Sequence, residues 1–233
     1  MTPLRISPSD RVLAVAAHPD DIDIACGGSI RRWAKAGTSI FYCLATSGEK
    51  GDHVTLDSPA EHRVDEQHRA ASILGVEGVE WLNERDGAVQ DSPSLRTKLA
   101  SVIRRVRPTI VLVHSPRMNL SSVRFSHPDH IAVGMATLAA IFPYARSAVL
   151  VDDGLDPWVV PRAIFFGDET PNVFVDIGNE VDDKVAAVSE HRSQLSGLPE
   201  DLRRFLVEWA EDLATRFRTR SQRIETFRTM DTA

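Results

Sequence analysis

The sequence contains little cysteine, with Cys26 and Cys43 as its two thiols. Two cysteines can build neither a disulfide framework nor a thiolate zinc cluster. A metal site in this chain would therefore depend mainly on nitrogen and oxygen ligands, which histidine and carboxylate side chains supply.

Long apolar runs and an excess of basic residues are also missing. The apolar run 12–17 lacks the flanking basic region and cleavage site of a signal peptide. The run 131–145 is shorter than the about 18 residues that span a bilayer, and it contains Pro143. The formal net charge is -6, and no Lys/Arg-rich stretch would attract a phosphate backbone. We therefore expect a cytoplasmic protein that binds neither membranes nor nucleic acid.

The composition is that of a folded chain. Hydrophobic residues make up 42% of the 233 residues, charged residues make up 26%, and both signs are mixed along the chain. A length of this order fits one domain with a substantial core. Because the chain shows no repeats and no Gly/Ser-rich linker, we expect a single domain over residues 1–233.

Segments rich in β-branched residues alternate with segments of helical spacing. This alternation is typical of α/β proteins, in which helices cross over between parallel strands. It predicts a Rossmann-like three-layer sandwich, with a mostly parallel central sheet and helices on both faces. The expected strands are residues 11–17, 38–45, 79–82, 109–114, 163–166 and 173–177, and the expected helices are residues 21–36, 58–74, 92–106, 127–141, 181–195 and 202–217.

A polar cluster, His18-Pro19-Asp20-Asp21, follows the first expected strand. Its imidazole and one carboxylate can bind a metal, while the other carboxylate faces the open coordination position. Zinc-dependent hydrolysis needs both metal ligands and a free carboxylate. The ion lowers the pKa of bound water to roughly 7, and the free carboxylate acts as the base that takes the proton. The alternative is that Asp20 and Asp21 only cap the following helix.

A second cluster, His127-Pro128-Asp129-His130, follows the strand 109–114 after a polar loop. The two histidines stand at i and i+3, so both rings can face one site. Loops at the carboxyl ends of parallel strands carry the ligands in such folds, which places both clusters at one edge of the sheet. The alternative is that the histidines of this cluster are ordinary surface residues near the start of a helix.

Together the two clusters resemble the LmbE/PIG-L family of zinc-dependent N-acetylglucosaminyl deacetylases. Each further match is weakly specific alone, but their common order and spacing extend the resemblance over nearly the whole chain. The further matching segments are Thr46-Ser47-Gly48-Glu49, Arg63-Val64-Asp65-Glu66, Asp86-Gly87, His191-Arg192-Ser193-Gln194 and Glu225-Thr226-Phe227.

The resemblance implies a zinc site formed by His18, Asp21 and His130, with Asp20 as the general base. Two imidazoles and one carboxylate also accept Fe²⁺ or Co²⁺. The implied function is a zinc-dependent hydrolase that removes an N-acetyl (N-acyl) group from a small amino sugar or amino-sugar conjugate. An alternative is a zinc amidase or esterase that acts on a non-sugar secondary metabolite.

The resemblance also implies roles for the rest of the second cluster. His127 would stabilise the oxyanion or protonate the leaving amine, and Asp129 would orient a histidine. Asp129 could instead act only as a helix-capping residue. Phe125 departs from relatives that carry Tyr or Asp near the reacting carbonyl, and a phenyl ring donates no hydrogen bond. Because of this departure, a further alternative function is a metal-binding module with an inactive site.

Three residues are candidates for binding the substrate: Arg63, Glu49 and Asp86. Arg63 would bind sugar hydroxyls or would pair with Glu66 on its own helix. Glu49 would contact substrate or stand in solvent. We expect His191, on an apolar helix face, to be a hydrogen-bonded packing residue. The C-terminal helices offer a surface for a homo-oligomer.

Overall fold

A mixed eight-stranded sheet runs through the centre of the computed structural model, which describes residues 1–50, 60–197 and 201–233. The strand order is β1-β7-β8-β6-β5-β2-β3-β4. Strands β2 to β6 pair in parallel, whereas β8 is antiparallel to both of its neighbours. The strands are β1 (Thr2–Pro3), β2 (Arg11–Ala16), β3 (Ser39–Leu44), β4 (Gly78–Trp81), β5 (Ile110–His114), β6 (Arg162–Phe166), β7 (Val173–Asp176) and β8 (Ile224–Asp231).

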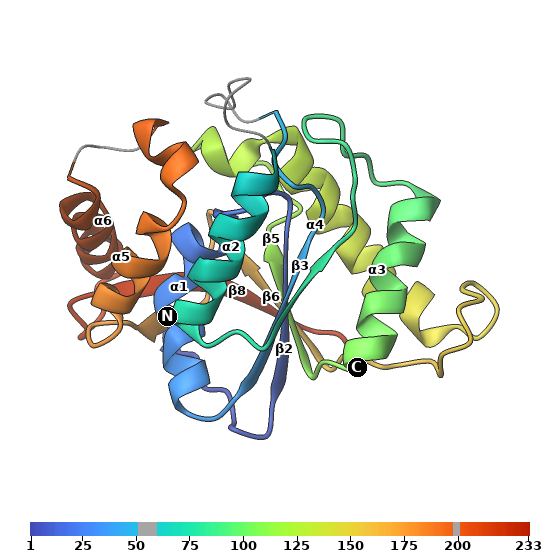
Figure 1. Cartoon of the computed structure of the whole chain (residues 1–233). Coiled ribbons are helices and arrows are strands. Elements are labelled where there is room, and N and C mark those ends of the chain that lie inside the picture. The colour runs from blue at the N-terminus through green and yellow to red at the C-terminus, as the bar shows by residue number, and fades with distance from the viewer. Residues whose placement is uncertain (51–59, 198–200) are drawn as a thin grey trace.

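Helices cover both faces of this sheet (Figure 1). One apolar cluster joins α1, α2, α5 and α6 to one face, and a second joins α3 and α4 to the other. The predicted Rossmann-like three-layer α/β architecture is therefore confirmed. The α-helices are α1 (Asp21–Lys35), α2 (Ala60–Leu74), α3 (Pro93–Val106), α4 (Pro128–Ile141), α5 (Val181–Ser189) and α6 (Leu202–Arg216).

After its first residue, the exposed Arg11, the central strand β2 is entirely apolar and buried on both sides. Leu13 and Val15 pack into the cluster under α3 and α4, whereas Val12 and Ala14 pack into the cluster under α1 and α2. Successive side chains of a strand point to opposite faces, so a doubly covered strand needs apolar residues at every position. The first polar residues after β2 therefore mark the carboxyl-terminal edge of the sheet, where the helices no longer cover the strand.

The structure corrects the end of one predicted helix and adds two strands, the short β1 and the longer β8. α5 ends at Ser189 and not at residue 195, and residues 192–197 form a 3₁₀ turn. The helix stops because the His191 ring turns inward to Asp23 and the Ser193 amide donates to Glu66 of α2. Strand β8 was not predicted. The predicted start of α2 at Ser58 lies outside the described residues.

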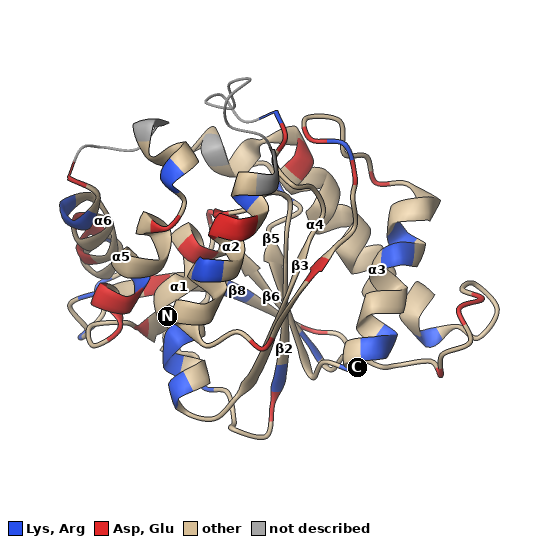
Figure 2. Cartoon of the chain, in the orientation of Figure 1, with Lys and Arg blue, Asp and Glu red and all other residues tan. Residues whose placement is uncertain are grey.

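Charged residues of both signs are spread over the helices on either side of the sheet (Figure 2). None of the helices in the described ranges combines the length and apolar character that a bilayer crossing requires.

Two adjacent glycines in α1 lie where the helix meets its neighbours. A Cβ added to Gly28 would lie 2.7 Å from Cβ of Ile177, closer than packed carbons approach. A Cβ added to Gly27 would lie 3.2 Å from Cγ of Lys184, which belongs to a flexible side chain. The close approach of α1 to Ile177 therefore requires glycine at position 28.

We predict that Gly28→Ala destabilises the protein, whereas Gly27→Ala has a much smaller effect. Alanine gains about 1 kcal/mol of helix propensity at either position. At position 28, overpacking against Ile177 costs about 1–3 kcal/mol or more and exceeds that gain. Urea unfolding of both variants measures the difference. Equal unfolding midpoints for the two variants would contradict this account of α1 packing.

Candidate functional site

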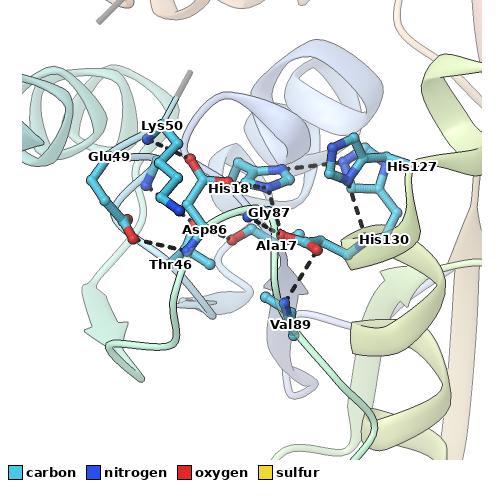
Figure 3. A network of polar contacts seen from close by, with 12 residues as sticks. Ala17, His18, Thr46, Glu49, Lys50, Asp86, Gly87, Val89, His127 and His130 are labelled. Atoms are coloured by element: carbon cyan, nitrogen blue, oxygen red, sulfur yellow. Dashed lines mark hydrogen bonds and ion pairs between the residues drawn. The ribbon is translucent and has the colours of Figure 1, made fainter. Parts of the chain in front are cut away.

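The two histidine clusters meet at the carboxyl ends of adjacent strands. β2 and β5 are parallel neighbours in the sheet, so the loop after β2 lies beside the segment that leads from β5 into α4. Nδ1 of His18 and Nε2 of His130 lie 3.3 Å apart, although 112 positions separate them in the sequence. Figure 3 shows the rings of His18, His127 and His130 converging there.

Asp21, the first residue of α1, joins these histidines. Its Oδ2 accepts a hydrogen bond from the His18 backbone N–H at 2.8 Å and lies 3.5 Å from His18 Nδ1. Its Oδ1 lies 3.2 Å from His130 Nε2. Burial favours the protonated carboxyl, yet His130 and His114 hold the pKa of Asp21 well below its ordinary value. The carboxylate is therefore ionised.

Within the described part of the chain, three overlapping groups of side chains have donor atoms close enough to share a metal ion. His18 and His130 each occur in two of the groups, and Asp21 occurs beside His130 in one. The groups are His18–His127–His130, Asp21–His114–His130 and His18–Asp86–Asp129.

His18 and His130 have donor atoms at the spacing of two ligands of a tetrahedral ion, and Asp21 approaches each of them with a different carboxylate oxygen. Nitrogen and oxygen ligands at about 2.0–2.1 Å from such an ion lie roughly 3.3 Å from one another. His18 Nδ1 lies 3.3 Å from His130 Nε2. Asp21 Oδ1 lies 3.2 Å from His130 Nε2, and the other oxygen, Oδ2, lies 3.5 Å from His18 Nδ1. The charge also fits: although burial opposes it, hydrogen bonds to Asp129, Asp21 and Asp86 raise the pKa of His18 to about 12. This carboxylate-rich pocket favours a cation.

Asp20 has a backbone that few residues other than glycine adopt. Its φ is 85° and its ψ is -30°, and its side chain makes no hydrogen bond that caps α1. Oδ2 of Asp20 lies 3.5 Å from the Arg63 guanidinium. Burial raises the pKa of the Asp20 carboxyl to about 6, against the opposing effect of Arg63. The strained turn directs this carboxylate away from the capping position, and its one hydrogen bond within the described residues is the long contact to Arg63.

The remaining residues of the second cluster surround His18. Asp129 accepts hydrogen bonds from the Gly87 and Val89 amides at 2.8 and 3.2 Å and lies 3.3 Å from His18 Nε2. Asp129 therefore contacts His18 and does more than cap a helix. His127 precedes α4, and its ring is edge-on to His18 at 5.0 Å between centroids. Partial burial, followed by the proximity of His18, lowers the pKa of His127.

The three candidates for substrate binding lie around the same site. Oδ1 of Asp86 is 3.1 Å from His18 Nε2, and Glu49 accepts a hydrogen bond from the Asp86 amide at 2.8 Å (Figure 3). Arg63 is 4% exposed and donates to the carbonyl oxygens of Gly48 and Pro19 at 2.8 and 3.0 Å. Arg63 thus holds the loops of the site and does not pair with Glu66.

Sequence reasoning missed His114, the last residue of β5. Its Nε2 lies 3.1 Å from Oδ2 of Asp21, and its ring stacks on His130 at 4.0 Å between centroids. Burial, followed by the proximity of His130, lowers the pKa of His114 to about 3, so its ring is neutral. The signal was available: a histidine that ends a fully apolar strand stands at the edge where ligands bind.

Phe125 packs away from this arrangement of donors. Its ring lies against Gly167, where an added Cβ would meet the ring at 2.6 Å. The Trp209 ring of α6 is 6.1 Å away between centroids. Phe125 therefore fixes the short 3₁₀ turn Arg124–Ser126 to the C-terminal part of the chain.

Several known proteins that this chain resembles are named as sugar deacetylases. The diacetylchitobiose deacetylase of Thermococcus kodakarensis is 32% identical over 200 residues, which cover 82% of this chain and 72% of that protein. A 1D-myo-inositol 2-acetamido-2-deoxy-α-D-glucopyranoside deacetylase of Kineococcus radiotolerans is 30% identical over 192 residues, which cover 68% of this chain and 52% of that protein. The structure of N,N'-diacetylchitobiose deacetylase from Pyrococcus horikoshii superposes with a TM-score of 0.84 at 28% identity, covering 96% of this chain and 84% of that chain.

The model of the PIG-L family, described as GlcNAc-PI de-N-acetylase, matches residues 13–141. This match contains the loop after β2, both histidine clusters, α2 and β5. Since it covers more than half of the 233 residues, the chain belongs to the PIG-L (LmbE) family.

Proposed function

We propose that this protein is a zinc-dependent hydrolase that removes the N-acetyl group from a small amino sugar or amino-sugar conjugate. The observation that carries the proposal is that side-chain donors of His18, Asp21 and His130 meet within 3.2–3.5 Å of one another, beside a carboxylate held in a strained turn. Two imidazoles and one carboxylate are a donor set of catalytic zinc sites, which keep one position open.

His18, Asp21 and His130 would hold the ion. Bound zinc would polarise the acyl carbonyl and lower the pKa of water to about 7. The same donor set also accepts Fe²⁺ or Co²⁺. Asp129 and His114 hydrogen-bond to His18 and Asp21, and such outer contacts fix the orientation of ligands.

Asp20 and His127 are the groups that would move protons. Asp20 would take the proton from the attacking water, because its carboxylate has no strong hydrogen bond within the described residues that would hold it in the resting enzyme. Its pKa of about 6 leaves it ionised at neutral pH but more basic than an ordinary carboxylate. His127 would donate a proton to the leaving amine or stabilise the oxyanion. The His127 ring is only partly buried, and its centroid lies 5.0 Å from the His18 ring and 5.1 Å from the His130 ring.

The relatives support an amino sugar as substrate. Their names state that they deacetylate diacetylchitobiose and an inositol glycoside of N-acetylglucosamine. Asp86 and Glu49, at the margin of the donor cluster, would accept hydrogen bonds from sugar hydroxyls. Arg63 would act on the substrate through the loops that it holds.

His130→Ala is expected to lose bound zinc, because it removes one of three protein ligands. The matched control is His62→Ala, which changes an exposed histidine on α2. Purified proteins are dialysed against a zinc buffer, and the metal content per chain is measured by mass spectrometry. Full zinc occupancy in His130→Ala would exclude this residue as a ligand.

Asp20→Asn should keep zinc and lose about 10²- to 10⁴-fold in kcat, the usual contribution of a general base. The assay measures acetate released from N,N'-diacetylchitobiose, with Asp65→Asn on the exposed face of α2 as the control. Wild-type kcat in Asp20→Asn would refute the base assignment.

A substrate panel tests the proposed chemistry separately from the base. Turnover of N-acetylated sugars supports the deacetylase. Turnover of only non-sugar acyl amides or esters would favour the alternative hydrolase. Stoichiometric zinc with no turnover of any acyl compound would indicate an inactive metal-binding module.

A further inference from the structure

A buried polar network lies beneath Asp20, and the reaction described above leaves it without a role. Its centre is Asp23 on α1, which is fully buried. The Asp23 carboxylate accepts hydrogen bonds from the Tyr42 hydroxyl at 2.9 Å, the Gln67 amide at 2.8 Å and the His191 ring at 2.8 Å. These donors come from β3, α2 and the segment after α5, so the carboxylate ties three other parts of the chain to α1.

Gln67 connects this network to the proposed general base. Its Nε2 donates to Asp23, and its Oε1 accepts a hydrogen bond from the Asp20 backbone N–H at 3.0 Å. The two contacts also fix the orientation of the Gln67 amide. In the reversed orientation the NH₂ group would face the Asp20 N–H donor, and the amide oxygen would face the Asp23 carboxylate acceptor. Gln67 is 1% exposed, so no water competes for these bonds.

The same peptide bond is held at its other end by Arg63. The Pro19 carbonyl accepts from the Arg63 guanidinium at 3.0 Å, while the Asp20 amide of that peptide donates to Gln67. Arg63 and Gln67 are one turn apart on α2, at i and i+4, and therefore lie on one face of the helix. Two side chains of one helix thus hold both polar groups of the Pro19–Asp20 peptide.

This arrangement matters because Asp20 is in the left-handed region, with φ at 85°. A residue with a side chain remains there only where its surroundings impose the conformation. Among the described residues, the Asp20 carboxylate has one hydrogen-bonding partner, Arg63 at 3.5 Å, so its direction follows mainly from the backbone.

We propose that Gln67, anchored by Asp23, is a positioning residue that fixes the Pro19–Asp20 peptide plane and so holds the Asp20 carboxylate in line with the attacking water. The inference rests on the proposed function, in which Asp20 is the general base. Gln67 touches neither the reacting atoms nor the metal donors and acts through the backbone of Asp20.

The test uses Gln67→Met, which keeps the length of the side chain and removes both hydrogen bonds. A displaced catalytic group costs on the order of 10²-fold, so we expect kcat for N,N'-diacetylchitobiose to fall about 10- to 100-fold. KM and zinc content should stay near their wild-type values. The control is Glu66→Met on the same helix, where a buried carboxylate accepts from Ser193 and not from Asp20. It should lower thermal stability but leave kcat within about twofold of wild type.

The decisive measurement repeats Gln67→Met in an Asp20→Asn background. If Gln67 acts through the Asp20 carboxylate, its removal has no further effect once that carboxylate is gone. The same fold-loss in both backgrounds, or a wild-type kcat in the single variant, would overturn the proposal. If Asp20→Asn alone keeps its activity, the base assignment of the proposed function fails first, which separates the two failures.

Tyr42→Phe provides a second variant should Gln67→Met not fold. It removes one of the three donors to Asp23 and leaves both bonds of Gln67 in place. A smaller fall in kcat that disappears in the Asp20→Asn background supports the proposal. A fall of equal size in both backgrounds, or no fall, overturns it.

Discussion

The site depends on the hydrogen bonds of one buried carboxylate, that of Asp21. An ionised carboxylate away from water is costly unless donors surround it. The His18 amide, His114 and His130 meet Asp21, and they come from the loop after β2, the end of β5 and α4. The requirement to satisfy this one group therefore brings together three segments that are distant in sequence. It also explains why His18, Asp21 and His130, the proposed metal ligands, lie close together.

A second buried ion pair extends this organisation to the C-terminal part of the chain. Lys184 of α5 and Glu225 of β8 are each 2% exposed and lie 2.6 Å apart. Glu225 also accepts from the Gly28 and Ser29 amides in the middle of α1. Such a pair is tolerated in a core only when other groups satisfy its remaining hydrogen-bonding capacity. The unpredicted antiparallel strand β8 thus supports α1, whose first turn carries Asp21.

The residues that sequence analysis located are those concentrated in short motifs. His18, Asp20 and Asp21 occupy one turn, and His127 and His130 lie at helical spacing, so local spacing was enough to place each group at a sheet edge. His114 could have been located as the polar end of an apolar strand, but its partners, and those of Gln67, depend on which strands and helices are neighbours. The strand order is not the chain order, and no local pattern shows that β5 lies beside β2. Strand β8 was missed because its sequence, IETFRTMD, is largely polar for a strand in a covered sheet.

The strained turn at Asp20 links the hydrogen bonds that hold the backbone to the direction of the Asp20 carboxylate. Glycine would adopt a φ of 85° without strain, but glycine has no carboxylate. For aspartate the conformation costs on the order of 1–3 kcal/mol. The hydrogen bonds that Arg63 and Gln67 make to the Pro19–Asp20 peptide contribute about 0.5–1.5 kcal/mol each, and more where the donor is charged. The cost of the backbone conformation and the combined contribution of the two hydrogen bonds are of similar size, so the turn has little net stabilisation. The loss of either contact would therefore be felt first in the direction of the Asp20 carboxylate, before the fold itself gives way.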